Sequence, residues 1–266
     1  MKLLSTQVTV LARIRFLRNF PYTGTLMHFL LLDTADARGC VAVFHDAELL
    51  ATQPHPAAED FSSWLLPAVD RALAQNQLSL GNLDGYAVCS GPGSFTGLRV
   101  GLTTVKAWAE IYRKPIAAVS RLEALARSGT GPVNPGPPFT AVFSDARRGQ
   151  VFAALFAASG APLEPETVIA IQTFLTRAEA ICGTSAILWK TPDPSLLETL
   201  PEWPRRRAGG DVLLEVDPPF AAQLGALARQ KFLAGQTTDA LALDANYVRR
   251  SDAELFWKDH SSALKA

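Results

Sequence analysis

The sequence has no excess of charge of either sign and no long apolar run. Lys plus Arg and Asp plus Glu each total 25 among 266 residues, so no overall field attracts a polyanion, as most free-standing nucleic-acid-binding proteins need. Any nucleic acid would therefore be reached through a local patch or a partner. No stretch approaches the roughly 18 apolar residues of a membrane-spanning helix, so we predict no contact with a membrane.

Cysteine and histidine are also scarce. The three cysteines are Cys40, Cys89 and Cys182, and they form no CxxC pair. Scattered cysteines of this kind are typical of buried thiols in a reducing compartment. The four histidines show no spacing that would bring two of them to one metal ion. We therefore predict a cytoplasmic protein with no metal site.

The first 26 residues differ from the rest of the chain. They contain Lys2, Arg13, Arg15 and Arg18 but no acidic residue. They lack the continuous apolar core and the small-residue cleavage site of a signal peptide. Because an apolar strand begins directly after Met27, we interpret residues 1–26 as a loose extension or the product of an upstream start codon. A membrane-seeking or organelle-targeting helix is the alternative.

Short apolar strands alternate with amphipathic helices in the remainder, which predicts an α/β fold. The segment 129–138, GTGPVNPGPP, is the richest in Pro and Gly and predicts a boundary between two subdomains. We therefore expect an N-terminal subdomain at 27–128, which carries two long helices, and a C-terminal subdomain at 129–266.

Both subdomains are predicted to begin with a similar hairpin. The first turn contains Asp36, Ala37, Arg38 and Gly39, and the second has the sequence DARRG at 145–149. Chance similarity is the alternative, because Asp and Gly are the residues that tight turns need. Two lobes that each open with a hairpin and a strand-end Asp resemble the actin-like class. This predicts a two-lobed actin-like (RNase H-like) α/β fold with a mixed sheet flanked by helices in each lobe.

Residues 91–108, GPGSFTGLRVGLTTVKAW, form the most informative segment. Its first glycines allow a sharp turn after a strand, and Ser94 or Thr96 can cap the helix that follows. Such a turn can bind phosphate on free amides, but the segment matches neither the P-loop nor the dinucleotide pattern. A tight strand-to-helix turn is the simpler interpretation. The alternative is a weak nucleotide site formed by Asp33, Thr34, Gly91, Gly93 and Ser94.

The two helices predicted at 61–73 and 95–112 carry more apolar surface than a surface helix needs. In the second helix, one face is expected to pack on the subdomain's own sheet; its residues are Leu98, Gly101, Leu102, Val105, Trp108, Ala109 and Tyr112. A further stripe of apolar and small side chains follows another face of each helix. It consists of Leu66, Val69, Leu73, Val100, Thr104, Ala107 and Ile111. Such a stripe is either covered within the chain or available to a partner.

Four segments resemble, in order, those of the TsaB (YeaZ) family of the actin-like ATPase superfamily. They are LLLDTA, GPGSFTGLRVGLTTVKAWA, SDARRGQVFAALF and NYVRRSDAELFW. The resemblance runs from about residue 27 to the C-terminus. It implies a noncatalytic subunit that acts with TsaD and the ATPase TsaE in N6-threonylcarbamoylation of adenosine 37, in tRNAs that read ANN codons.

The resemblance also implies how such a subunit assembles. It implies a heterodimer with a TsaD-like paralogue through the helices that match 61–73 and 95–112, so that the second apolar stripe faces the paralogue. Contact with tRNA would be indirect, through the complex. A homodimer through the same face is the expected alternative when the partner is absent.

The paralogue also shows what this sequence lacks. TsaD-like proteins carry two histidines four residues apart on the helix after the strand that matches PIAAVS, and both bind one metal ion. This sequence has Arg121 and Leu125 there. Ala35 and Ala146 follow the strand-end aspartates where glycines would let amides approach a phosphate. The resemblance therefore implies no cofactor and no independent ATP hydrolysis, and at most weak ATP or ADP binding shared with the partner.

Two other functions remain as alternatives. An actin-like nucleotide-binding enzyme, either a small-molecule kinase or an ATPase, would need a catalytic Asp beside a glycine-rich phosphate loop, and none follows residue 150. A tRNA-binding module would need a basic stripe with interleaved aromatic residues. The candidates are the arginines at 205–207 beside Trp203 and those at 249–250 beside Tyr247. We interpret the first cluster as solvated surface.

Overall fold

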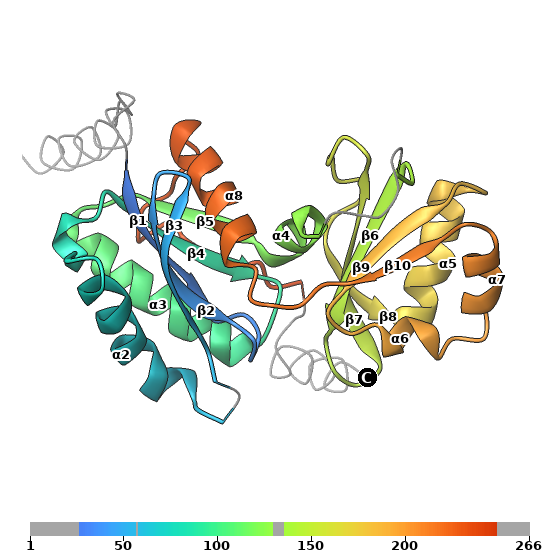
Figure 1. Ribbon diagram of the computed structural model, residues 1–266, viewed down its shortest axis with the longest axis horizontal. Helices are drawn as coiled ribbons and strands as arrows, with labels where there is room; N and C mark the ends of the chain where they lie inside the picture. Colours follow the sequence, from blue (N-terminus) through green and yellow to red (C-terminus); the bar gives the residue numbers. More distant parts are fainter. Residues whose placement is uncertain (1–26, 57, 130–135, 249–266) are drawn as a thin grey trace, which may run out of the picture.

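The computed structural model describes residues 27–56, 58–129 and 136–248. Two five-stranded sheets form two lobes, with helices on their faces and between them (Figure 1). The predicted extension at 1–26 lies outside the described residues. Among the residues that are described, no helix combines the length and the apolarity that crossing a membrane requires.

The sheet of the first lobe has the strand order β3-β2-β1-β4-β5. Its strands are β1 (His28–Asp33), β2 (Cys40–His45), β3 (Glu48–Pro54), β4 (Gly85–Gly91) and β5 (Ile116–Ser120). The first three strands are antiparallel, whereas β4 runs parallel to β1 and β5 parallel to β4. Helices α2 (Phe61–Ala74) and α3 (Phe95–Tyr112) cover one face of this sheet, and a short 3₁₀ turn (Leu80–Asn82) precedes β4.

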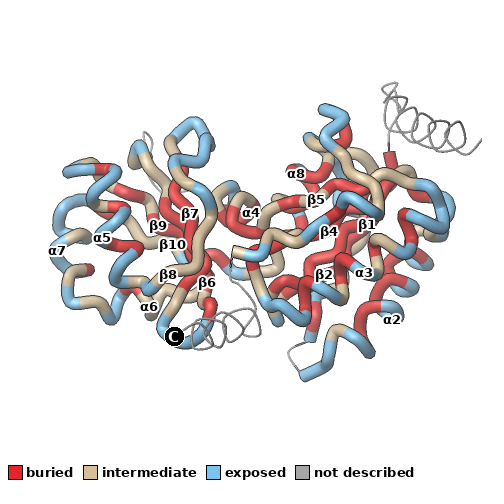
Figure 2. The backbone as a smooth tube through the Cα atoms, turned by 180° about the vertical axis from the view of Figure 1, so that it is seen from behind, coloured by how far each residue is buried: buried red, intermediate tan, exposed pale blue. Residues whose placement is uncertain are grey.

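The central strand β1 is buried on both faces, as Figure 2 shows for the middle of the sheet. Phe29 stacks on Phe44 of β2 with 4.9 Å between ring centroids, on the side away from α3. Leu30 points the other way and pairs with Tyr86 of β4, whose ring contacts Trp108 of α3. Burial on both faces explains why β1 reads as a continuous apolar run and not as an alternating one.

The sheet of the second lobe has the order β10-β9-β6-β7-β8. Its strands are β6 (Phe139–Asp145), β7 (Gln150–Ala157), β8 (Thr167–Ala170), β9 (Ile187–Thr191) and β10 (Val212–Glu215). Its outer helices are α5 (Ile171–Cys182), α6 (Ser195–Glu198) and α7 (Trp203–Ala208). Three antiparallel strands followed by two parallel ones repeat the topology of the first lobe. The predicted two-lobed actin-like fold with duplicated subdomains is therefore confirmed.

The two turns that suggested the duplication do not occupy equal positions. Asp33 is the last residue of β1 and Asp145 is the last residue of β6, so these two aspartates correspond. Asp36 lies further along, inside the turn that leads to β2. The shared letters Asp-Ala-Arg therefore come from turns of different length.

Two helices lie between the sheets and determine how the lobes are connected. Helix α4 (Arg121–Arg127) follows β5 and packs both on β4 and β5 of the first lobe and on β6, β7 and β9 of the second. Helix α8 (Ala221–Leu233) follows the second sheet but returns to β5, β1 and β2 of the first (Figure 1). Apolar residues between Phe220 and Val248, which were predicted to belong to the C-terminal subdomain at 129–266, thus pack in the core cluster that contains the first sheet.

Candidate functional site

A cleft of about 1230 Å³ opens between the lobes. Its lining comes from the β1–β2 turn, the starts of α3 and α4, the β6–β7 turn and the segment that ends at Val248. In α/β proteins, ligands commonly bind beyond the carboxyl ends of the strands, and Asp33 and Asp145 both end strands here. The cleft is therefore the candidate binding or catalytic site.

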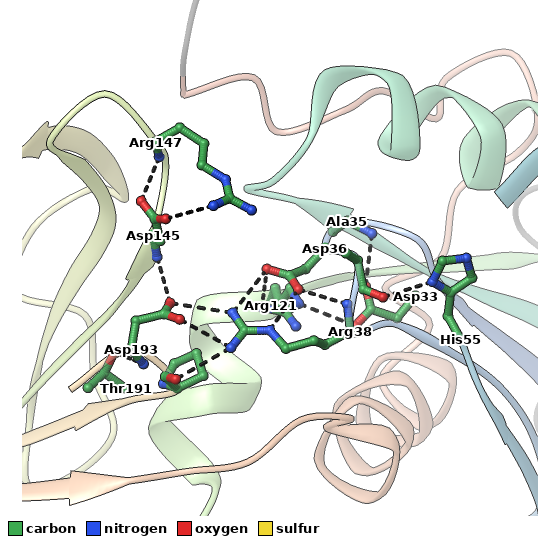
Figure 3. Close-up of polar contacts among 12 residues, drawn as sticks. Asp33, Ala35, Asp36, Arg38, His55, Arg121, Asp145, Arg147, Thr191 and Asp193 are labelled. Atoms are coloured by element: carbon green, nitrogen blue, oxygen red, sulfur yellow. Dashed lines mark hydrogen bonds and ion pairs between the residues drawn. The ribbon is translucent and has the colours of Figure 1, made fainter. Parts of the chain in front are cut away.

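Asp33 and Arg121 form a buried ion pair beneath the cleft, whose lining includes Arg121 but not Asp33 (Figure 3). Asp33 is 0% exposed and Arg121 is 2% exposed. The Arg121 Nε donates to Asp33 Oδ2 at 3.3 Å, and the backbone N–H of Ala35 donates to Asp33 Oδ1 at 3.0 Å. Arg121 Nη1 also lies 3.8 Å from Asp36 Oδ2, so one guanidinium serves two carboxylates.

The contacts between Arg121, Arg38 and the nearby carboxylates shift the pKa of Asp36 and of Arg121. Burial alone would raise the pKa of Asp36, but Arg121 and Arg38 outweigh it and hold that pKa below its ordinary value. Burial alone would lower the pKa of Arg121, but Asp33 and Asp36 outweigh it and raise that pKa. Asp36 and Arg121 therefore stay charged at neutral pH.

Arg38 continues the charged network across the cleft to the second lobe. Its Nη1 lies 3.1 Å from Asp193 Oδ1, and it donates to the carbonyl of Pro192. Asp193 Oδ2 in turn accepts from the backbone N–H of Asp145 at 2.8 Å (Figure 3). The Arg38 side chain is 40% exposed, so solvent screens this link more than the Asp33 pair. The sequence offered no signal for the Arg38 link to Asp193, because 155 positions separate the two residues.

The glycines at the start of α3 bring this helix onto the turn after β1. A Cβ at Gly93 would lie 2.2 Å from the Ala35 carbonyl oxygen, and one at Gly97 would lie 2.1 Å from that of Thr34. The backbone N–H of Ser94 donates to the Ala35 carbonyl at 2.7 Å, and its hydroxyl accepts from the Gly97 N–H at 3.3 Å. Ser94 is thus the helix cap, and the segment is the tight strand-to-helix turn that the sequence suggested.

The five residues of the weak nucleotide site do not lie together on one surface. Asp33 and Thr34 are fully buried, and the Thr34 hydroxyl donates to the Gly97 carbonyl. Gly91 is buried, and a Cβ there would lie 3.0 Å from the carbonyl oxygen of Asn246. Only Gly93 and Ser94 line the cleft. Nucleotide binding by this set stays a prediction, and its glycines already have a packing role.

The outer face of α3 is the second candidate site. The residues expected against the sheet are buried, except Tyr112 at the C-terminal end. On the outer stripe, Ile111 is 68% exposed, Ala107 is exposed, and Val100 and Thr104 are half-buried. The Thr104 hydroxyl donates to the Val100 carbonyl at 2.8 Å, so it needs no partner on this face.

Helix α2 corrects part of the predicted stripe. Val69 and Leu73 are buried in the chain's own core, whereas Leu66 is 55% exposed. The reason is that α2 packs on β2, β3 and α3 together, which widens its buried arc beyond one stripe. We name the exposed remainder, Leu66, Val100, Thr104, Ala107 and Ile111, the α2–α3 face.

Comparison with known proteins places the chain in a family. The family model of TsaD, tRNA N6-adenosine threonylcarbamoyltransferase, matches residues 48–182, just over half of the 266 residues. The chain belongs to the TsaD family.

Individual members of the TsaD family and of its TsaB group are also similar. The tRNA threonylcarbamoyladenosine biosynthesis protein TsaB of Bacillus subtilis is 28% identical over 237 residues, which cover 87% of this chain and 98% of that protein. The tRNA N6-adenosine threonylcarbamoyltransferase of Persephonella marina is 35% identical over 71 residues, covering 27% of this chain and 21% of that protein. The structure of YeaZ from Pseudomonas aeruginosa has a TM-score of 0.63 at 23% identity, covering 84% of this chain and 100% of that one. The resemblance to TsaB (YeaZ) is confirmed.

The metal that the resemblance associates with TsaD does not fit the residues present here. Leu125 is buried in the core, and Arg121 brings a permanent positive charge to the position of the other histidine. Across the ranges that the structure describes, no three His, Cys, Asp or Glu side chains gather as metal ligands would. We therefore derive no metal chemistry for this member of the TsaD family.

The basic clusters considered for tRNA differ from what the sequence suggested. Arg206 donates to both carboxylate oxygens of Asp211, at 2.8 and 2.9 Å, so it is a structural residue and not solvated surface. Arg205 pairs with Glu179, and the arginines at 249–250 lie outside the described residues.

Tyr247, which the second cluster included, lies at the rim of the cleft, where its hydroxyl accepts a hydrogen bond from Arg99 Nε at 3.4 Å. Because 148 positions separate Arg99 from Tyr247, no local sequence pattern signals this contact.

Proposed function

We propose that the chain is a noncatalytic partner subunit in the formation of threonylcarbamoyladenosine in tRNA. Membership of a family named for tRNA N6-adenosine threonylcarbamoyltransferase assigns the chain to this modification system. With a TsaD-like paralogue and a TsaE-like ATPase, it supports threonylcarbamoyl transfer to N6 of adenosine 37 in tRNAs that read ANN codons. The tRNA is reached through the complex and not by this chain alone.

The α2–α3 face is the observation that carries the proposal. Helix α3 is an 18-residue helix that already buries one face on its own sheet. Its outer face presents Ile111 beside the small Ala107, which allows a second helix to approach closely. Apolar side chains exposed along a helix are typical of a protein interface. We propose that a TsaD-like paralogue covers this face, and that a second copy of the chain covers it when the paralogue is absent.

The interlobe cleft supports the noncatalytic part of the proposal. Both carboxylates at or beneath its floor are neutralised by Arg121, and the glycines of the α3 turn are packed against Thr34 and Ala35. A catalytic site would need charged groups free to act on a substrate. We therefore propose no cofactor for the isolated chain, and that ATP or ADP binds weakly and only where the partner contributes to the site.

The Ala107→Arg variant tests the interface. An arginine there would hold two helices apart and lose water on binding, so the complex with the TsaD-like paralogue should weaken about 30- to 1000-fold, or roughly 2 to 4 kcal/mol. Because Ala107 is exposed in the free chain, its own free energy of unfolding should change by no more than about 0.5 kcal/mol. Isothermal titration and urea unfolding measure the two quantities.

A matched control is Ala180→Arg, which makes the same change on an exposed position of α5 in the second lobe. It should alter neither quantity. Unchanged binding by Ala107→Arg would disprove the interface, and unfolding of that variant would show that the face is internal. Separately, with labelled threonylcarbamoyl-adenylate as the donor and AMP as the leaving group, the purified chain alone should transfer no threonylcarbamoyl group to tRNA, whereas addition of the paralogue and the ATPase should give transfer.

A further inference from the structure

Arg121 makes fewer hydrogen bonds than a buried arginine can. Its Nη2 has no hydrogen-bond partner among the described residues, although the side chain is almost fully buried and lines the cleft. Its Cζ lies 4.9 Å from the centre of the Phe220 ring, which covers the guanidinium on one side. Burying an arginine with an unpaired donor costs free energy. The compensating gain must come from its charge, which faces Asp33 and Asp36.

The place of Arg121 in its helix supports this reading. Arg121 is the first residue of α4, where the helix dipole presents its positive end and disfavours a cation. An acidic residue is the ordinary choice in a first turn, as Glu123 is in this helix. The positive charge is therefore held there by the two carboxylates and not by the helix.

The same two carboxylates are ligands that a divalent cation prefers. Mg²⁺ and Ca²⁺ bind carboxylate and carbonyl oxygens, and Ca²⁺ tolerates irregular geometry. Asp33 Oδ2 and Asp36 Oδ2 both face the guanidinium, at 3.3 Å from Nε and 3.8 Å from Nη1. Among the other charged groups of the cleft, Arg38, Asp145, Arg147 and Asp193 are paired with one another or with Asp36.

We propose that Arg121 is a built-in cation, which occupies a divalent-cation site between Asp33 and Asp36 and keeps such a cation out of the cleft. The cleft then balances its charges with its own side chains. This inference concerns the isolated chain and does not depend on the partner. Because an arginine cannot release its proton to make room for a metal, the positive charge at this position is permanent.

Calcium is a suitable probe, and the test uses the full chain with two substitutions at one position. Arg121→Ser removes the charge and opens space, whereas Arg121→Lys keeps a positive charge. Arg121→Ser should bind Ca²⁺ with a Kd of about 10⁻³ M or tighter, the range of weak protein calcium sites. The unaltered chain and Arg121→Lys should bind at least about tenfold more weakly. Adding Asp36→Asn to Arg121→Ser should remove the gain.

Isothermal titration with CaCl₂ and melting curves against NaCl of equal ionic strength give the readouts. A folded Arg121→Ser variant that gains no Ca²⁺ affinity overturns the proposal, as does equal binding by the unaltered chain. If Arg121→Ser does not fold in NaCl, CaCl₂ or the added substitution Asp33→Asn should restore folding, because either one neutralises the buried carboxylate. Failure of both to restore folding also overturns the proposal.

Discussion

The two lobes share one strand order but differ in the helices that link their two parallel strands. In the first lobe, β4 and β5 are joined by α3, which has 18 residues. In the second lobe, β9 and β10 are joined by α6 and α7, which have 4 and 6 residues. The long helix presents an apolar outer face, whereas α7 uses Arg206 to bind Asp211 of its own lobe. One topology therefore yields an exposed apolar helix face in one copy and internal packing in the other.

The interiors of the two lobes also differ in how their helices pack on the sheets. The first lobe brings α3 against β1 by means of Gly97 and Gly101, whose added Cβ atoms would meet Thr34. The second lobe fills its interior with aromatic rings, where Trp189 contacts Phe174 and Trp203 edge to face. Backbone contact holds α3 in place, and side-chain packing holds the second lobe together.

Gly97→Ala should have the largest effect, because it tests the backbone contact of the first lobe. Helix propensity alone would favour alanine by about 1 kcal/mol. The new Cβ would lie 2.1 Å from a carbonyl oxygen, so α3 must move away from β1. We expect a loss of about 4 kcal/mol or more in the free energy of unfolding, measured in urea. Gly160→Ala in the second lobe is the control, because an added Cβ there has no atom within 4 Å. It should lower the free energy of unfolding by only about 1 kcal/mol, because the positive φ of Gly160 is unfavourable for alanine.

Arg206→Ala should cause the second-largest loss in the free energy of unfolding, because it leaves the buried carboxylate of Asp211 without the arginine that pairs with it. Asp211 also accepts from the Ile187 N–H and from Trp189 Nε1, so it remains partly satisfied. We expect a loss of about 3 kcal/mol in urea unfolding. The neighbouring Arg207→Ala, on an exposed side chain, serves as the control and should stay within about 0.5 kcal/mol. Equal effects would mean that α7 is surface and not part of the second core.

Lys190→Met tests the contact between the lobes. The Lys190 Nζ of β9 donates to the carbonyls of Ala126 and Ser128 at the end of α4, each at 2.7 Å. Burial lowers the pKa of this lysine, so its charge is costly and its hydrogen bonds must compensate. Loss of these hydrogen bonds should lower the free energy of unfolding by about 2 kcal/mol and speed hydrogen exchange in α4. The control Lys114→Met, just after α3, should change neither the free energy of unfolding nor hydrogen exchange in α4. Unchanged exchange in α4 of Lys190→Met would contradict the role of Lys190 in joining the lobes.

Glu166→Gln should have the smallest effect and should depend on pH. The Glu166 carboxylate accepts from the Ser120 hydroxyl and the Asn246 amide, which joins both lobes and the C-terminal segment. Burial raises the pKa of Glu166, and the two hydrogen bonds offset this only in part. The contribution of Glu166 to stability is thus full below its unfolded pKa of about 4.3 and falls as pH rises through the higher folded pKa.

The glutamine cannot titrate, so the stability of Glu166→Gln relative to the unaltered chain should increase between about pH 4 and pH 7. The total change should stay within about 1 kcal/mol, measured by urea unfolding at several pH values. A constant difference across this range would show that the carboxyl has the same pKa in both states.

Periodicity predicted the elements that are long and buried on one face. The helix expected at 95–112 is α3 at the same bounds, and the one expected at 61–73 is α2 with one more residue. The strands β3, β8 and β10 were not predicted, because they lie at sheet edges and most of their residues are partly exposed. Two of them, β8 and β10, are also only four residues long, which is the shortest length at which a strand pattern can be detected.

The candidate site could be predicted only in part. The outer stripe of α3 follows from spacing within one helix. Burial of Val69 and Leu73 depends on where α3 lies against α2, which no local pattern contains. The pair of Asp33 and Arg121 joins residues 88 positions apart, so only the fold brings their charges together.

The crossing of α4 and α8 has a consequence for how the chain can be divided. Each helix ends one copy of the duplicated unit and packs on the sheet of the other copy. Two separate half-chains built in this way would form a domain-swapped dimer, and here both copies are fused in one polypeptide. A protease cut between residues 129 and 136 should therefore leave two fragments that remain associated, and neither fragment should fold by itself.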